Sequence, residues 1–102
     1  MNQTNLFNIS GTVLALPEIR LFTRMLQSVD HTYSLEEGDD EQVRTMLDML
    51  VLTGLIERFV DGDGDVMDLW VITDEAIEWV LDPHVQADMS VANTVFDMQV
   101  QA

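Results

Sequence analysis

The chain has 102 residues, a length that suits one domain with one modest core. It carries 19 acidic residues against four basic ones, for a formal charge of −15, and a charge of this sign opposes binding to phosphate or to an anionic membrane. Cysteine is absent, which excludes disulfides and thiolate metal sites, while a hydrophobic content of 47% is that of a globular protein and not of a disordered chain.

Residues 1–13 are predicted to form a polar arm, without the basic start of a signal peptide. The apolar runs are too short to cross a bilayer, so we expect no membrane partner and a cytoplasmic location, which is the host cytoplasm if the protein is viral. Pro17 suits the first position of a helix over Pro17–Val29. Three- and four-residue spacing predicts its buried side as Ile19, Phe22, Met25, Leu26 and Val29.

Asp30 to Tyr33 form a connector. The pattern from Ser34 to Glu37 is that of a capping box, and it predicts at most a short helix because Gly38 follows at once. A longer helix is expected over Glu41–Thr53, capped by Asp39 or Asp40 and ended by Gly54. Its buried stripe is predicted to be Val43, Met46, Leu47 and Leu50.

A hairpin is expected next, with strands at Leu55–Val60 and Val66–Ile72 joined by an acidic turn at Asp61–Asp65. In the second strand, Met67, Leu69 and Val71 are expected to face the core, with Asp68 and Trp70 on the other side. Trp70 would then be partly exposed, either as an interface anchor or packed under the C-terminal tail.

Thr73 is expected to cap a helix over Asp74–Leu81 that buries Ile77, Val80 and Leu81, and Pro83 is expected to end it. The last residues fit two structures. Phe96, Met98 and Val100 alternate with polar residues as in an edge strand, whereas Met89, Ala92 and Phe96 would share one face of a helix.

The order helix, short helix, helix, hairpin, helix resembles a winged helix-turn-helix domain. The strongest match is the stretch from Met46 to Arg58, which is similar to the "LxxLxxxGLIER" segment of bacterial and archaeal transcription regulators; Leu69 to Ala76 resembles the second wing strand and the helix after it. The resemblance covers Leu14 to Leu81. It implies an α+β fold with three helices, a two-stranded wing, a following helix and a short tail, divided into an arm (1–13), a domain (14–82) and a tail (83–102) that serves as a dimerisation or edge element.

In that family the start of the recognition helix enters the DNA major groove and the wing tip contacts phosphate. Here both places are acidic, so DNA binding is not expected at ordinary salt. The resemblance leaves only four residues compatible with DNA: Gln42, Arg44, Thr45 and Arg58. The residues expected to contact a protein partner instead are Asp39, Asp40, Glu41, Asp61, Asp63, Asp65, Asp68 and Trp70.

Catalytic and metal sites are not expected. The run from Asp61 to Asp65 starts like a calcium loop, but Val66 stands at position six and Ile72 at position twelve, where glycine and glutamate are needed. His31 and His84 have no second histidine at ligand spacing, and no nucleophile elbow or phosphate loop occurs. We therefore expect no enzyme activity and no cofactor.

Three functions remain open. The preferred one is an acidic winged-helix protein that binds a basic protein surface, in its most concrete form a phage or mobile-element inhibitor that mimics DNA charge. The alternative is a winged-helix transcription regulator of a halophilic archaeon or its virus, in which acidity is an adaptation to salt. The third is a scaffold subunit docked through Trp70 and the apolar tail, and a homodimer is compatible with each.

Overall fold

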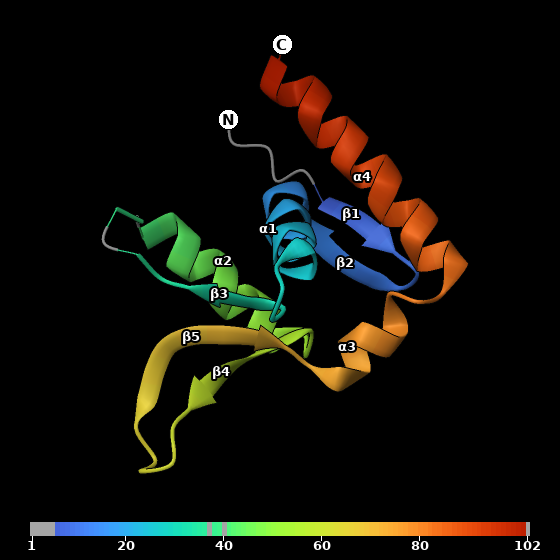
Figure 1. Cartoon of the computed structure of the whole chain (residues 1–102). Coiled ribbons are helices and arrows are strands. Elements are labelled where there is room, and N and C mark those ends of the chain that lie inside the picture. Colours follow the sequence, from blue (N-terminus) through green and yellow to red (C-terminus); the bar gives the residue numbers. More distant parts are fainter. Residues whose placement is uncertain (1–5, 37, 40, 102) are drawn as a thin grey trace.

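The computed structural model describes residues 6–36, 38–39 and 41–101, and these form an α+β fold with four helices and two small antiparallel sheets (Figure 1). Strands β1 and β2 pair with each other, while β3, β5 and β4 form a second sheet in that order. The elements in chain order are β1 (Leu6–Ile9), β2 (Thr12–Ala15), α1 (Leu16–Gln27), β3 (Thr32–Ser34), α2 (Glu41–Leu52), β4 (Ile56–Val60), β5 (Val66–Ile72), α3 (Asp74–Trp79) and α4 (Pro83–Gln101).

The prediction of a polar arm is wrong for residues 6–13, which belong to the β1–β2 hairpin. Ser10 and Gly11 both take positive φ, 48° and 98°, and the side-chain oxygen of Asn8 accepts from the Gly11 N–H at 2.7 Å. Positive φ at both central residues matches the twist of the flanking strands, so this short turn joins them directly. Residues 1–5 lie outside the described part of the chain.

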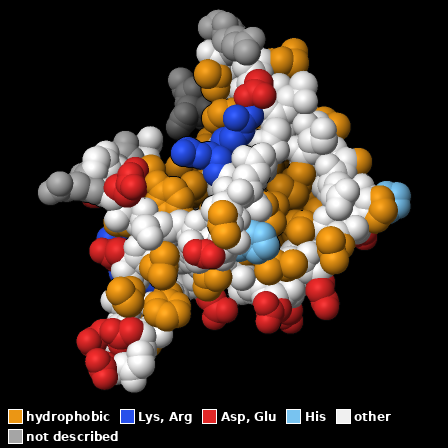
Figure 2. Space-filling model, in the orientation of Figure 1, with side chains coloured by type: hydrophobic (Ala, Val, Ile, Leu, Met, Phe, Trp, Pro, Cys, Tyr) orange, Lys and Arg blue, Asp and Glu red, His pale blue; other side chains and the backbone are white. Residues whose placement is uncertain are grey.

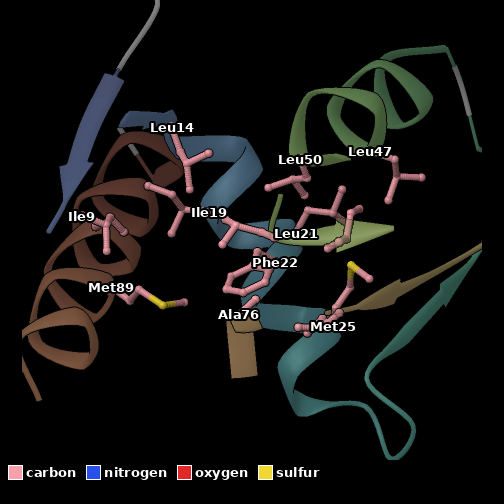
Figure 3. Packing of buried hydrophobic residues seen from close by; sticks show 14 of the residues in the cluster. Ile9, Leu14, Ile19, Leu21, Phe22, Met25, Leu47, Leu50, Ala76 and Met89 are labelled. Carbon is pink, nitrogen blue, oxygen red and sulfur yellow. The ribbon is translucent and has the colours of Figure 1, made fainter. Parts of the chain in front are cut away.

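Helix α1 is the centre of the core. Its start is held by Glu18, whose carboxylate accepts from the Ala15 N–H at 3.0 Å. Ile19, Phe22 and Met25 are buried as predicted, whereas Val29 is 97% exposed because the helix ends at Gln27. In Figure 3, buried side chains of α1 point towards α2 on one side and towards β1 and α4 on the other.

The short helix expected after Ser34 is not present among the described residues of that segment. Thr32–Ser34 is instead an edge strand, in which Tyr33 pairs with Trp70 of β5, and the Asp39 N–H bonds to the Glu36 carbonyl at 3.0 Å in the following turn. Glu37, the far end of the expected capping box, lies outside the described residues.

Helix α2 and its end agree with the sequence to within one residue. Leu47 and Leu50 are fully buried, Val43 and Met46 are half-buried, and Gly54 follows with φ at +84°. That left-handed conformation is the one that glycine tolerates after a helix. It turns the chain directly into β4.

The orientation predicted for β5 is wrong. Trp70 and Ile72 are buried, and Met67 on the opposite side is 42% exposed. Both sides of this strand are apolar, so alternation alone did not decide between them. The larger side chain of Trp70 occupies the core side, beside Ile56 and Ile72, which pair across β4 and β5.

Thr73 caps α3 as predicted, accepting from the Ala76 N–H at 3.2 Å, but Leu81 is exposed. Pro83 follows α3 as expected, but it also stands at the first position of the 19-residue helix α4. Asp82 caps this helix by accepting from the His84 N–H at 2.8 Å. The tail is therefore helical, and Val85, Met89 and Ala92 are buried in the core. None of the described helices has the length and apolar character needed to cross a bilayer.

Candidate functional site

The tip of the β4–β5 hairpin is an ordered acidic turn. One carboxylate oxygen of Asp61 accepts from the backbone N–H groups of Asp63 and Asp65, both at 2.9 Å, and Gly64 takes a φ of +86°. The side chain of Asp61 therefore shapes the turn. Those of Asp63 and Asp65 are exposed, which makes them the carboxylates that a partner would meet.

Behind the acidic tip, the hairpin carries exposed hydrophobic side chains. Val60 pairs with Val66, and these two with Phe59 and Met67 are between 42% and 57% exposed. The register shifts between Arg58 and Val60, and β5 bends sharply as the hairpin leaves the body (Figure 1). Figure 2 shows red acidic side chains at the end of this projection and orange hydrophobic ones behind them. We call the segment from Phe59 to Met67 the acidic finger.

Both arginines that could contact DNA are held by one carboxylate. An oxygen of Asp68 lies 2.5 Å from Nη2 of Arg58 and 3.5 Å from Nη2 of Arg44. The two guanidinium groups also lie over the ring of Trp70, at 5.0 Å and 6.0 Å from its centroid. Trp70 is thus buried beneath two arginines that share one carboxylate, and it is not an exposed anchor.

Asp39 has a local structural role. Its carboxylate accepts from the Tyr33 hydroxyl and from the Glu36 N–H, both at 2.9 Å. The bond from the Glu36 N–H, followed by that from Tyr33, lowers the pKa of Asp39 below its usual value. Burial raises the pKa of Tyr33, and the bond to Asp39 and the charge of Asp39 raise it further.

The remaining residues of the predicted sites lie at the start of α2, away from the hairpin tip (Figure 1). Glu41, Gln42 and Thr45 are exposed and line an open cavity of about 390 Å³ together with Pro17 and Met46. Asp40 lies outside the described residues. The predicted acidic surface therefore divides into separate parts, at the hairpin tip and at the start of α2. A further group of predicted site residues, Arg44, Arg58, Asp68 and Trp70, lies together at the base of the hairpin.

Sequence reasoning missed the roles of the other two arginines. Arg20 bonds to Asn93, forms an ion pair with Asp97 and lies over Phe96 at 4.9 Å, which ties α1 to α4. Arg20 and Arg24 also line a cleft of about 510 Å³ beside Tyr33. The i, i+4 spacing of Arg20 and Arg24 is visible in the sequence. The partners of Arg20 on α4 could not be inferred, because the sequence fits the tail equally to a strand and to a helix.

Within residues 6–36, 38–39 and 41–101, no group of three or more acidic or histidine side chains is placed to hold a metal ion. Comparison with known proteins gives no match to a family model, to a curated protein or to a solved structure. The acidic finger and the cluster of Arg44, Arg58 and Asp68 are therefore the features whose geometry and charge indicate a function.

Proposed function

We propose that this chain is an acidic protein of winged-helix type that acts by binding a basic protein surface through the acidic finger. The observation that carries the proposal is the distribution of charge on the hairpin. Asp63 and Asp65 are exposed at its tip, whereas Arg44 and Arg58, the cations nearest to it, are occupied by Asp68.

The order of elements supports the winged-helix assignment. Helix α1, strand β3, helix α2 and the β4–β5 hairpin follow one another, and a further helix comes after the hairpin. The departure is the segment between β3 and α2, where the described residues form no helix. A winged-helix fold does not by itself specify DNA binding, because the same scaffold serves different functions through different surfaces.

The surface of the finger suits a protein better than DNA. Exposed carboxylates at the tip repel phosphate and attract lysine and arginine. The apolar stem of Phe59, Val60, Val66 and Met67 has no matching partner along a DNA backbone, but it can pack against the apolar wall of a protein groove. We therefore infer a partner whose groove has a basic floor and apolar sides.

Grooves of this kind occur where proteins bind nucleic acids. The partner that we propose is therefore a nucleic-acid-binding protein. The finger would enter the nucleic-acid channel of a nuclease, a polymerase or a defence complex and block it, as a phage or mobile-element inhibitor does. Charge complementarity of this kind accelerates association and makes it sensitive to salt.

The test compares two doubly substituted variants that change the net charge equally. Asp63→Asn with Asp65→Asn removes charge from the finger but keeps Asp61, which shapes the turn. Glu75→Gln with Glu78→Gln removes the same charge from exposed positions on α3. Each protein is immobilised, and the basic nucleic-acid-binding proteins captured from a host lysate are quantified with and without added duplex DNA.

We expect the wild type and the α3 variant to capture the same proteins, the finger variant to lose them, and duplex DNA to displace them. Equal capture by both variants would move the binding site away from the finger. Capture that DNA does not displace would retain protein binding but contradict the mimicry of DNA.

A second function is favoured by one observation. Arg44 of α2 and Arg58 of β4 lie beside each other over Trp70, at the junction of helix and hairpin. If molar salt loosens their pairing with Asp68 and screens the acidic surface, the two guanidinium groups could contact DNA. This regulator of a salt-adapted organism would bind DNA only at high salt, whereas the protein-binding function predicts no DNA binding at any salt.

A further inference from the structure

The cleft beside Tyr33 is lined by charges of both signs. It measures about 510 Å³, which is within the range of small-molecule sites, and its lining comes from α1, β3, the turn after β3, α2 and α4. Two arginines of α1, Arg20 and Arg24, line it together with two carboxylates of the turn, Glu36 and Asp39. We call it the α1–β3 cleft. A ligand that enters it meets cationic and anionic groups at once.

Arg24 is the cation that this cleft offers to a ligand. The other three arginines each form an ion pair with an aspartate. In the described part of the chain Arg24 forms no such pair, and its side chain is exposed. The bonds of Arg20 to Asn93 and Asp97 use Nε and Nη2, so its Nη1 takes no part in them. Because a guanidinium presents its N–H groups as a planar fork, Arg24 is suited to receive a carboxylate.

Asp39 is the matching anion. The Tyr33 hydroxyl and the Glu36 N–H both donate to its Oδ2, at 2.9 Å, so Oδ1 takes no part in these two bonds. An ionised carboxylate has about four acceptor positions, which leaves Asp39 able to accept from an ammonium group. After the bonds from Glu36 and Tyr33, the charge of Arg24 also contributes to the lowered pKa of Asp39, so the two opposite charges lie near each other.

The net charge of the protein selects among ligands. At −15, its field repels a molecule that carries only negative charge. A molecule that carries only positive charge is attracted to every exposed carboxylate and is repelled by Arg24 within the cleft. A zwitterion has no net charge, and it can place its carboxylate at Arg24 and its ammonium group at Asp39. We propose that the α1–β3 cleft binds a small zwitterion with an apolar body, which is the chemistry of a free amino acid with a large apolar side chain.

The rest of the cleft suits the apolar body of such a ligand. Its apolar lining residues are Pro17, Leu21, Val43, Met46 and Phe96. In Figure 2, orange hydrophobic side chains separate the blue basic ones from red acidic ones near the start of α2. The acidic finger projects from a different part of the molecule (Figure 1), so this site does not depend on the proposed function.

The experiment is an NMR titration of the full chain, with isotope-labelled methionine methyl groups, near neutral pH. Met46 lines the cleft, whereas Met67 on the acidic finger serves as the reference in the same spectrum. The probe is L-phenylalanine, added to about 20 mM so that millimolar dissociation constants are measurable. Two analogues are titrated in the same way: 3-phenylpropionate lacks the ammonium group of the probe, and phenethylamine lacks its carboxylate.

Four variants separate the local charges from the net charge. Arg24→Gln and Glu36→Gln each remove one charge from the cleft, and they change the net charge in opposite directions. Leu52→Glu, at the end of α2, and Glu75→Gln, on α3, make the same changes of net charge at exposed positions outside the cleft lining. Circular dichroism of each variant verifies that its helices are intact.

We expect L-phenylalanine to shift the Met46 signal saturably without shifting that of Met67, and both analogues to bind more weakly. Arg24→Gln and Glu36→Gln are each expected to weaken the binding of L-phenylalanine by about three- to tenfold, and the two controls to leave it unchanged. A Met46 signal that L-phenylalanine does not shift would overturn the proposal, as would equal weakening by the controls. Tighter binding of 3-phenylpropionate, or of L-phenylalanine to Glu36→Gln, would also overturn it, because either result indicates a site for anions alone.

Discussion

At the scale of single residues, the acidic side chains of this protein have different functions. Asp61 and Asp39 accept backbone N–H groups and shape loops, and Asp68 holds two arginines over Trp70. Asp63 and Asp65 are exposed at the tip of the finger. A charge count treats all of these residues alike, and only the structure separates those that organise the fold from those that remain for a partner.

The pair of Tyr33 and Asp39 gives a pH prediction. Since the pKa of Asp39 is lowered in the folded protein, its stabilising effect is present above the unfolded pKa and is lost as the pH falls through the lower folded value, that is, below about pH 4. The pKa of Tyr33 is raised, so its contribution is present below about pH 10 and is lost as the pH rises through the higher folded value.

Tyr33→Phe is expected to raise the pKa of Asp39, because one of its two hydrogen bonds is lost. The pKa should nevertheless remain below the ordinary value, since the bond from the Glu36 N–H is the larger cause of the shift. An NMR titration of the Asp39 carboxyl carbon measures this directly. An unchanged Asp39 pKa in Tyr33→Phe would show that the hydroxyl does not bond to this carboxylate in solution.

Asp68→Asn tests the arginine cluster. We expect the variant to lose up to about 1 kcal/mol of unfolding free energy, because both ion pairs are partly exposed to solvent, and to lose less at molar salt. Urea denaturation at low and high KCl gives both values. Asp63→Asn removes an unpaired carboxylate and should be neutral or slightly stabilising, so equal losses in the two variants would contradict the cluster.

At the scale of elements, the sequence predicts the helices and strands whose apolar residues follow one clear period. Helices α1 and α2 and the β4–β5 hairpin were predicted because their apolar spacing and the flanking proline, glycine and aspartate residues indicate the same structure. The β1–β2 hairpin was missed although Ser10-Gly11 is a short-turn signal between two alternating segments. For α4, the strand and helix periods overlap in the sequence. The packing of α4 against α1 and β1, in which Val85, Met89 and Ala92 are buried, decides for the helix.

The candidate site was less predictable than the fold. The acidic turn is local, so the sequence showed it. Arg44 from α2 and Arg58 from β4 are distant along the chain, and they lie together over Trp70 only when the hairpin folds against α2. Sequence spacing carries no signal for such a contact, and the orientation of β5 was predicted wrongly for the same reason.

The end of α2 provides an element-scale prediction. Gly54→Ala is expected to lower the unfolding free energy by about 1–2 kcal/mol, because φ at this position is +84° and alanine is strained there. The added Cβ would meet no atom within 4 Å, so the cost is that of the backbone alone. Gly62→Ala is the matched control, without positive φ and with equally open space. Similar losses for both in urea denaturation would contradict this explanation.

At the scale of the whole molecule, the charge of −15 affects both folding and association. Like charges repel within the compact state, so added salt should stabilise the protein whichever function is correct. The two proposed functions predict different DNA binding once salt screens the charge of the protein. Salt adaptation predicts that DNA binding appears with screening, whereas recognition of a basic protein predicts that it does not.

The most direct test of the central claim is a titration of fluorescent random duplex DNA with this protein at about 0.1 M and about 2 M KCl. Binding is measured by anisotropy, and circular dichroism of the same samples reports folding. We expect a folded protein and no DNA binding at either salt concentration. Folding and DNA binding that appear together only at 2 M KCl would contradict it and identify a salt-adapted DNA-binding regulator.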